Sequence, residues 1–260
     1  MSESQLLVER RGAVQWITIN RPEVRNALND VVLNGIRDGI RDAMQNPQLR
    51  AIVLTAAGDK AFCAGGDLKR GGGGPFSFSA AQIENPMIGL FKLVETCNLP
   101  IIARVNGHVM AGGMGLLCAC DLAVASDSAL FGTPETKIGL FPMMILSYML
   151  RIIPRRKLLE MCITGEPIDA QEALRLGMIN YAVPAAELDS KLDALLSTIV
   201  NRSPTAIKIG KHAFHAMQDM SIHEAFDYAQ AVIPLMSQTD DAREGFASFN
   251  EKRPPDWPGN

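Results

Sequence analysis

The stretch Leu99–Met144 reads LPIIARVNGHVMAGGMGLLCACDLAVASDSALFGTPETKIGLFPMM, and it decides the fold. Its pattern predicts a strand at 100–105, a glycine-rich turn at 106–113, an apolar helix at 114–120, a strand at 122–125 and a loop. A helix that begins at Gly112 and Gly113 leaves backbone N–H groups without intrahelical partners. Such groups can bind a phosphate, or an oxygen that becomes negative during a reaction. Glu135, an acid in apolar surroundings within the loop, is a candidate proton carrier.

Strands and helices alternate on the N-terminal side of this stretch, which indicates an α/β fold with parallel pairing. Asn29 is a candidate N-cap for a helix in which Val32, Ile36, Ile40 and Ala43 recur at helical spacing. The other predicted elements are strands at 5–9 and 13–19 in a hairpin, a strand at 51–55, a strand-to-glycine junction at 61–68, a loop at Gly71 to Gly74 and a helix at 86–97.

After Pro154 the pattern predicts only helices, at 187–200, 204–217, 222–236 and 241–251. Asp169 and Glu172 have the spacing of a capping box, and Gly177 suits a helix end. This helical region is a candidate second layer over the active site or a surface between subunits. Ligands of parallel α/β folds bind beyond the strand ends, where both glycine junctions are expected.

Composition excludes several classes of function. The chain has 260 residues, 47% of them hydrophobic, and a net charge of −3, so nothing favours binding to nucleic acid or to an anionic membrane. Its five cysteines follow no disulfide framework, which predicts reduced thiols and a cytoplasmic location. No signal peptide is expected, and no uncharged apolar run reaches the roughly 18 residues of a membrane helix.

Each candidate residue also has a structural interpretation. Gly112 and Gly113 could serve only a tight turn, although a second junction at Gly65-Gly66 allows two N–H groups to converge on one oxygen. Glu135 could instead cap a helix or pair with Lys137 or an arginine. No GxGxxG or GxxxxGK[ST] nucleotide fingerprint and no GxSxG or HExxH signature occurs.

The remaining polar candidates are predicted to be structural. His212 and His215 could share a metal, but no third ligand is near in sequence, so no metal site is predicted. His108 is expected to line a pocket or the core, Asp121 to cap or pair, and Cys118 and Cys120 to lie in the core.

Five segments resemble the crotonase family, the enoyl-CoA hydratases and isomerases. They are RPEVRNALN (21–29), AFCAGGDL (61–68), VNGHVMAGGMGLLCACDLAVAS (105–126), FGTPETKIGLFP (131–142) and ITGEPIDAQEALRLGMIN (163–180). The resemblance implies a crotonase-like spiral of ββα units at 1–200, with the active site, and a helical region at 201–260 for oligomerisation and covering CoA. It also implies acyl-CoA thioester substrates, no metal or redox cofactor, and homotrimers or dimers of trimers.

The resemblance assigns roles to individual residues. Gly66 and Gly112 match the two oxyanion donors, and Glu135 matches the catalytic glutamate. The segments with Arg25, Ala64 and Leu68 match those that line CoA. Phe249 and Lys252 resemble C-terminal residues that reach CoA, in some relatives from a neighbouring subunit.

One position departs from the family pattern. Hydratases with two glutamates have the second a few residues after the oxyanion glycine, where this chain has Gly115. Hydration of a 2-enoyl-CoA, possibly branched, is the expected reaction; a Δ3,Δ2-enoyl-CoA isomerase and a non-catalytic acyl-CoA-binding scaffold are the alternatives. Met143, Met144 and Ile145 predict a bulky apolar wall for the acyl pocket.

Overall fold

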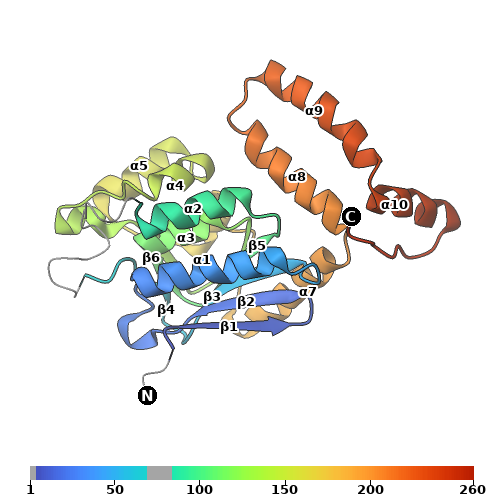
Figure 1. Ribbon diagram of the computed structural model, residues 1–260. Helices are drawn as coiled ribbons and strands as arrows, with labels where there is room; N and C mark the ends of the chain where they lie inside the picture. Colours follow the sequence, from blue (N-terminus) through green and yellow to red (C-terminus); the bar gives the residue numbers. More distant parts are fainter. Residues whose placement is uncertain (1–3, 69–83) are drawn as a thin grey trace.

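The computed structural model describes residues 4–68 and 84–260, and it contains two sheets, helices packed against them and a helical arm (Figure 1). The predicted loop at Gly71 to Gly74 lies outside the described residues. The first sheet consists of β1 (Leu6–Arg11), β2 (Val14–Ile19), β3 (Ala51–Ala56), β5 (Ile101–Val105), β7 (Leu122–Ser126) and β10 (Tyr181–Val183), in that spatial order. The second consists of β4 (Ala61–Cys63), β6 (His108–Met110), β8 (Leu130–Gly132) and β9 (Ile168–Asp169).

The first sheet is parallel apart from its edge. β1 and β2 form the predicted antiparallel hairpin, and β2, β3, β5, β7 and β10 then pair in parallel. All six residues of β3 are buried, as expected for a central strand with both faces covered. The alternating strands and helices thus produce the predicted α/β fold.

Ten α-helices occur in the described residues. They are α1 (Asp30–Gln45), α2 (Pro86–Thr96), α3 (Gly112–Ala119), α4 (Leu146–Ile152), α5 (Arg155–Thr164), α6 (Ala170–Arg175), α7 (Leu188–Val200), α8 (Pro204–Met217), α9 (Ile222–Ser237) and α10 (Asp240–Glu251). Asn29 caps α1 as predicted, because its side chain accepts a hydrogen bond from the Val32 amide at 2.9 Å. The helix then buries Val32, Ile36, Ile40 and Ala43.

Three short strands correct two predictions. The turn predicted at 106–113 contains strand β6, and the region after Pro154, predicted to be wholly helical, contains β9 and β10. These strands have only two or three residues, too few for an alternating pattern to show in the sequence. Tertiary pairing defines them: β6 pairs with β4 and β8, and β9 pairs with β8.

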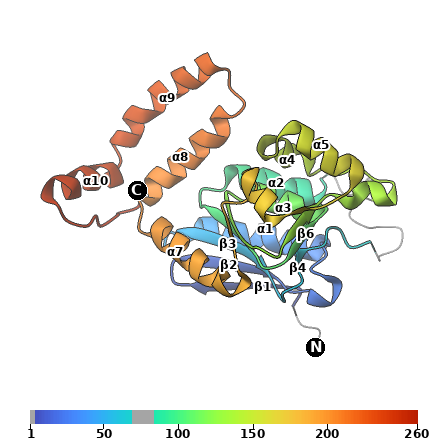
Figure 2. The same cartoon turned by 180° about the vertical axis from the view of Figure 1, so that it is seen from behind.

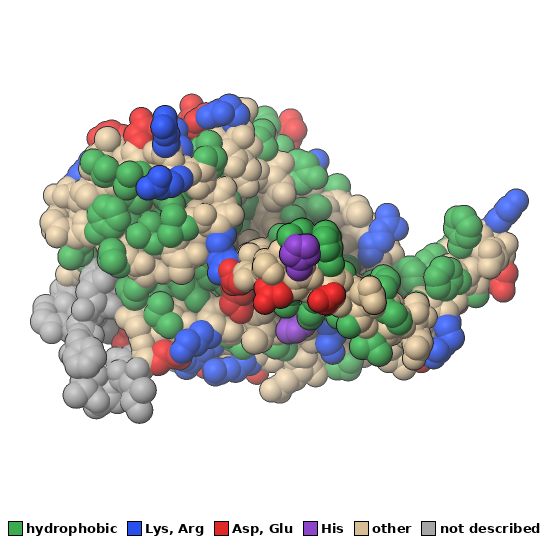
Figure 3. Space-filling view, turned by 90° about the horizontal axis from the view of Figure 1, so that it is seen from above, with side chains coloured by type: hydrophobic (Ala, Val, Ile, Leu, Met, Phe, Trp, Pro, Cys, Tyr) green, Lys and Arg blue, Asp and Glu red, His purple; other side chains and the backbone are tan. Residues whose placement is uncertain are grey.

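Helices α8, α9 and α10 form an arm that extends away from the sheets (Figures 1 and 2). The arm exposes large apolar side chains, and the space-filling view shows hydrophobic groups along it (Figure 3). These side chains are Phe214, Ile222, Phe226, Ile233, Leu235, Phe246 and Phe249. Of the helices in the described residues, none is long and apolar enough to cross a membrane.

Candidate active site

The two glycine junctions predicted from the sequence lie against each other. Gly112 is the first residue of α3, and a Cβ added to it would lie 3.7 Å from the Cα of Gly65. Gly65 has a φ of +99°, and a Cβ there would come within 2.6 Å of the Ala111 Cβ. Only glycine tolerates both this backbone conformation and this close approach.

The backbone of Gly66 is oriented by a parallel bridge to Leu28. The Leu28 amide donates to the Gly65 carbonyl at 2.7 Å, and the Asp67 amide donates to the Leu28 carbonyl at 2.8 Å. In a parallel bridge of this kind the flanking residues make the bonds, so the N–H of the central residue points away from the partner strand. The Gly66 amide is thereby directed away from Leu28.

The Gly112 amide is oriented by a strained residue. Ala111, directly before it, has φ 50° and ψ −123°, a conformation that side chains rarely adopt. Hydrogen bonds hold it there: the Ala111 amide donates to the Gly132 carbonyl, and the Met114 amide donates to the Ala111 carbonyl, both at 2.9 Å. As the first residue of its helix, Gly112 has no intrahelical acceptor for its N–H.

Glu135 lies in a 3₁₀ turn, Pro134–Ile138, and its residue is only 8% exposed. Its Oε2 is buried and has no hydrogen-bond partner among the described residues. Burial raises the pKa of this carboxyl above its ordinary value, an effect only partly opposed by a hydrogen bond from its own backbone. The alternative of a pair with Lys137 is wrong, because Lys137 binds Glu166 at 2.8 Å.

A cavity of about 370 Å³ brings the three predicted catalytic residues together: Gly66, Gly112 and Glu135 all line it. The rest of its wall is mostly apolar and includes the predicted Met143, Met144 and Ile145. The other lining residues are Leu28, Leu33, Asn85, Met87, Ala111, Gly139, Leu140, Phe141 and Pro142. This arrangement can surround an apolar chain, and the Glu135 carboxylate and the glycine backbones of the two turns are among its polar groups.

The space beside Gly115 is filled. A Cβ added to this residue would lie 2.3 Å from Cγ2 of Ile145 and 3.0 Å from Cζ of Phe91. Both neighbours are buried members of the core. The position at which two-glutamate relatives are expected to have a second acid therefore borders packed apolar side chains.

A second cavity, of about 510 Å³, is lined by Arg25 and Ala64. It borders the same glycine turns, since it is lined by Ala64 and Met110 while the apolar cavity is lined by Gly66 and Ala111. Lys60 and His108 add basic groups to its wall, as Asp59 adds an acid. Leu68, predicted with Arg25 and Ala64, is 58% exposed and lines neither cavity.

The structure does not bring Phe249 and Lys252 to these cavities within one chain. Both lie at the end of α10, and Phe249 is 82% exposed. Helix α10 is the last helix of the arm (Figure 1). It lies away from the sheets (Figures 1 and 2), and neither residue lines either cavity.

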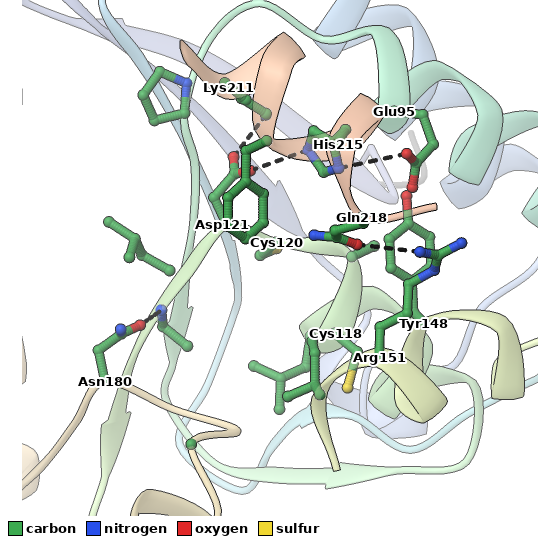
Figure 4. Close-up of a pocket in the computed structure, with 18 of the residues that line it drawn as sticks. Glu95, Cys118, Cys120, Asp121, Tyr148, Arg151, Asn180, Lys211, His215 and Gln218 are labelled. Carbon is green, nitrogen blue, oxygen red and sulfur yellow. Dashed lines mark hydrogen bonds and ion pairs between the residues drawn. The ribbon is translucent and has the colours of Figure 1, made fainter. Parts of the chain in front are cut away.

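A further cavity, of about 540 Å³, lies where α8 meets the core (Figure 4). Asp121 accepts from the Ile101 amide and from Lys211 Nζ at 2.6 Å, which confirms its predicted structural role. Burial opposes ionisation, but His215 and Lys211 outweigh it and lower the Asp121 pKa. His215 Nδ1 also lies 3.4 Å from Glu95 Oε2. Among the described residues, no group of three or more His, Cys, Asp or Glu side chains is placed so that it could hold a metal ion.

Sequence analysis missed two apolar residues that shape the site. Leu28 borders both glycine turns, and its Cδ1 would lie 3.3 Å from a Cβ on Gly112. Phe91 reaches Gly115 from α2. Neither residue has a chemical signature, and only the fold brings either one to the site.

Comparison with known proteins identifies the class. A model of the enoyl-CoA hydratase/isomerase family matches residues 9–260. A Mycobacterium bovis protein named probable enoyl-CoA hydratase is 35% identical, with 99% of each chain covered. The chain therefore belongs to the enoyl-CoA hydratase/isomerase family, as the resemblance predicted.

Solved structures agree with this assignment and confirm the crotonase-like fold. The crystal structure of an enoyl-CoA hydratase from Mycobacterium smegmatis has a TM-score of 0.91 and 33% identity, covering 98% of this chain and 99% of the other. Human enoyl-CoA hydratase domain-containing protein 3 has a TM-score of 0.89 and 29% identity, covering 97% and 100%.

Proposed function

We propose that this protein hydrates a 2-enoyl-CoA thioester to a 3-hydroxyacyl-CoA. The observation that carries the proposal is that Gly66, Gly112 and Glu135 line one cavity, in which a Glu135 oxygen is buried with no hydrogen-bond partner in the part of the chain that the structure describes. Family membership and the names of the relatives support the same reaction.

The proposed mechanism uses an enolate. As a water oxygen bonds to C3, the C2–C3 π electrons move toward the thioester, and negative charge develops on its oxygen. The Gly66 and Gly112 amides stabilise this charge, and backbone donors keep their orientation and do not titrate. Glu135 takes the proton that the water loses and returns it to C2, so one carboxyl completes the addition.

The proposal assigns the substrate to the two cavities that border the glycine turns. The acyl chain, possibly branched, occupies the apolar one and the thioester carbonyl lies between the turns. The anionic CoA portion lies toward Arg25 and Ala64, where Lys60 supplies a further positive charge. Leu68, which is exposed and lines neither cavity, would contact only a part of CoA that extends beyond them. CoA is then part of the substrate, and the chemistry needs no metal or redox cofactor.

We further propose that residues 201–260 serve assembly into trimers or dimers of trimers and cover CoA. The exposed phenylalanines of the arm support this role, because patches of this kind mark interaction surfaces. In such an assembly Phe249 and Lys252 would reach a neighbour's CoA. Sedimentation tests the state, and a monomer at micromolar concentration would contradict it. A cytoplasmic location and no nucleic-acid or membrane partner complete the proposal.

Isomerisation of a 3-enoyl-CoA is the second candidate. The packing of Ile145 and Phe91 against Gly115 favours it, because Glu135 is then the one acid among the described residues that line the site, and one acid can move a proton from C2 to C4. The two reactions differ in ultraviolet absorbance. Loss of the conjugated enoyl band from a 2-enoyl-CoA, with incorporation of ¹⁸O from labelled water, supports hydration.

The opposite outcomes overturn the proposal. Appearance of that band from a 3-enoyl-CoA, with no water added to the 2-enoyl-CoA, would establish the isomerase. Binding of both thioesters without turnover of either would indicate a scaffold.

A further inference from the structure

A buried ion pair lies directly behind the Gly66 turn. Arg21 Nη2 contacts Asp67 Oδ2 at 2.8 Å, and both side chains are about nine-tenths buried. Asp67 follows Gly66 in the chain, and its amide makes one of the two hydrogen bonds of the bridge to Leu28. The pair lines none of the cavities described above, so its side chains do not touch the space proposed for substrate.

The other contacts of Arg21 hold the opposite side of the bridge. Its Nη1 donates to the Ala27 carbonyl at 2.6 Å, and its amide donates to Asn26 Oδ1 at 3.0 Å. Ala27 precedes Leu28, the residue bridged to Gly66. The guanidinium therefore connects both strands of the bridge, one through a backbone carbonyl and the other through a carboxylate.

Asn26 connects this loop to the sheets. It adopts the left-handed conformation with φ 56°, is 1% exposed, and donates to the carbonyls of Ala57 at 2.9 Å and Ala61 at 2.7 Å. Ala57 follows β3, and Ala61 begins β4. These hydrogen bonds fix the loop to both sheets, and the contact of Arg21 with Asp67 fixes the Gly66 turn to the loop.

We propose that Arg21 and Asp67 are positioning residues that set the direction of the Gly66 amide toward the thioester oxygen. This inference rests on the proposed function. A buried ion pair is weak evidence of a stabilising role, because its desolvation offsets its attraction. Its fork geometry instead suits it to fixing two backbone segments relative to each other. A misdirected donor reduces transition-state stabilisation more than it reduces ground-state binding.

The test substitutes each partner conservatively. Asp67→Asn removes the charge and keeps the shape, and Arg21→Lys keeps the charge but lacks the fork that reaches two acceptors. We expect each variant to lower kcat by about tenfold to a hundredfold, as displacement of a group by about 1 Å does, while KM changes less than about threefold. The control is Asp121→Asn, which leaves the buried Lys211 without its carboxylate but lies away from the glycine turns.

A spectroscopic measurement separates positioning from stability. Butanoyl-CoA with ¹³C at its carbonyl is bound to each protein, and the infrared C=O band is recorded. We expect a shift to lower frequency in the wild type and in Asp121→Asn, and a smaller shift in Asp67→Asn and Arg21→Lys. If one of these two fails to fold, the other carries the test.

Three outcomes would overturn the inference: unchanged kcat in the Asp67 and Arg21 variants, an unchanged band despite a lower kcat, or an equal kcat loss in Asp121→Asn. A wild-type protein that turns over no enoyl-CoA would instead refute the proposed function, so the two failures are distinguishable.

Discussion

Replacement of Gly115 by glutamate tests whether the packing beside it excludes a second acid. An added Cβ would lie 2.3 Å from Ile145 Cγ2, closer than real side chains approach, so a neighbour must move. Ile145 is 4% exposed and Phe91 5%, and both are held in the core. Gly115→Glu alone is therefore expected to destabilise the protein rather than to improve hydration.

The expected loss of folding stability in Gly115→Glu has one contribution from packing and one from charge. Overpacking a core costs about 1–3 kcal/mol. Replacing a glycine inside a helix returns about 1 kcal/mol, so Gly115→Ala should cost up to about 2 kcal/mol. A buried carboxylate without a partner adds several kcal/mol more, so Gly115→Glu should cost at least about 3 kcal/mol. At about 2–4 °C for each kcal/mol, Tm should fall by about 6 °C or more.

Ile145→Ala provides the double-mutant cycle. Alone it leaves a cavity and should cost about 2–5 kcal/mol. Combined with Gly115→Glu it removes the Cγ2 that collides, so the double variant should be more stable than the sum of the two effects by about 0.5–3 kcal/mol. With room for the acid, the double variant should also hydrate 2-enoyl-CoA faster than Ile145→Ala does.

Urea unfolding and the loss of enoyl absorbance measure these quantities. Wild-type stability in Gly115→Glu, or strict additivity in the cycle, would refute the reasoning, because either would mean that Ile145 does not occupy the space.

Three further predictions concern Glu135 and Ala111. Glu135→Gln should lower kcat by about 10²–10⁴-fold and leave calorimetric binding of a saturated acyl-CoA intact; an active variant would remove Glu135 from the mechanism. Burial raises the pKa of Glu135 above 4.5, so the folded protein binds this proton more tightly than the unfolded chain does. The protonated carboxyl therefore favours folding, and this stability is lost as the pH rises through the folded-state pKa. Glu135→Gln should therefore be more stable than the wild type at pH 7, with the difference closing below about pH 4.5 in chemical denaturation; an equal difference at all pH values would contradict this. Ala111→Gly should relieve backbone strain of about 1–3 kcal/mol, while the added freedom of glycine in the unfolded chain opposes this by about 1 kcal/mol. The variant should therefore be as stable as the wild type or more stable, and its kcat should fall. A drop in Tm would show that Ala111 is unstrained.

Much of the fold could be predicted because local chemistry agrees with it. Asn29 caps α1 as its residue type indicates, and α8 spans Pro204–Met217 as predicted. The short strands β6, β8 and β9 could not be predicted, because pairing between distant segments creates them. Strand β6 matters for the site, because it ends just before Ala111 and Gly112, where α3 begins.

The site could be predicted in part for the same reason. Glycines at strand ends and an isolated acid leave a sequence signal, and the structure places Gly66, Gly112 and Glu135 around one cavity. The close packing of Ile145 against Gly115 leaves no sequence signal, because residues 30 positions apart meet only through packing of α3 against α4. The buried ion pair of Arg21 and Asp67 likewise could not be predicted, because no sequence pattern relates these two positions.

The amides of Gly66 and Gly112 belong to the main chain, and among the substitutions of either residue only one by proline would delete the N–H. The part of the site proposed to polarise a carbonyl is thus inherited with the fold itself, whereas the acids around it are free to be exchanged. A lineage built on this scaffold can change which carbon gains or loses hydrogen by altering one or two pocket residues, without having to rebuild the electrophilic centre.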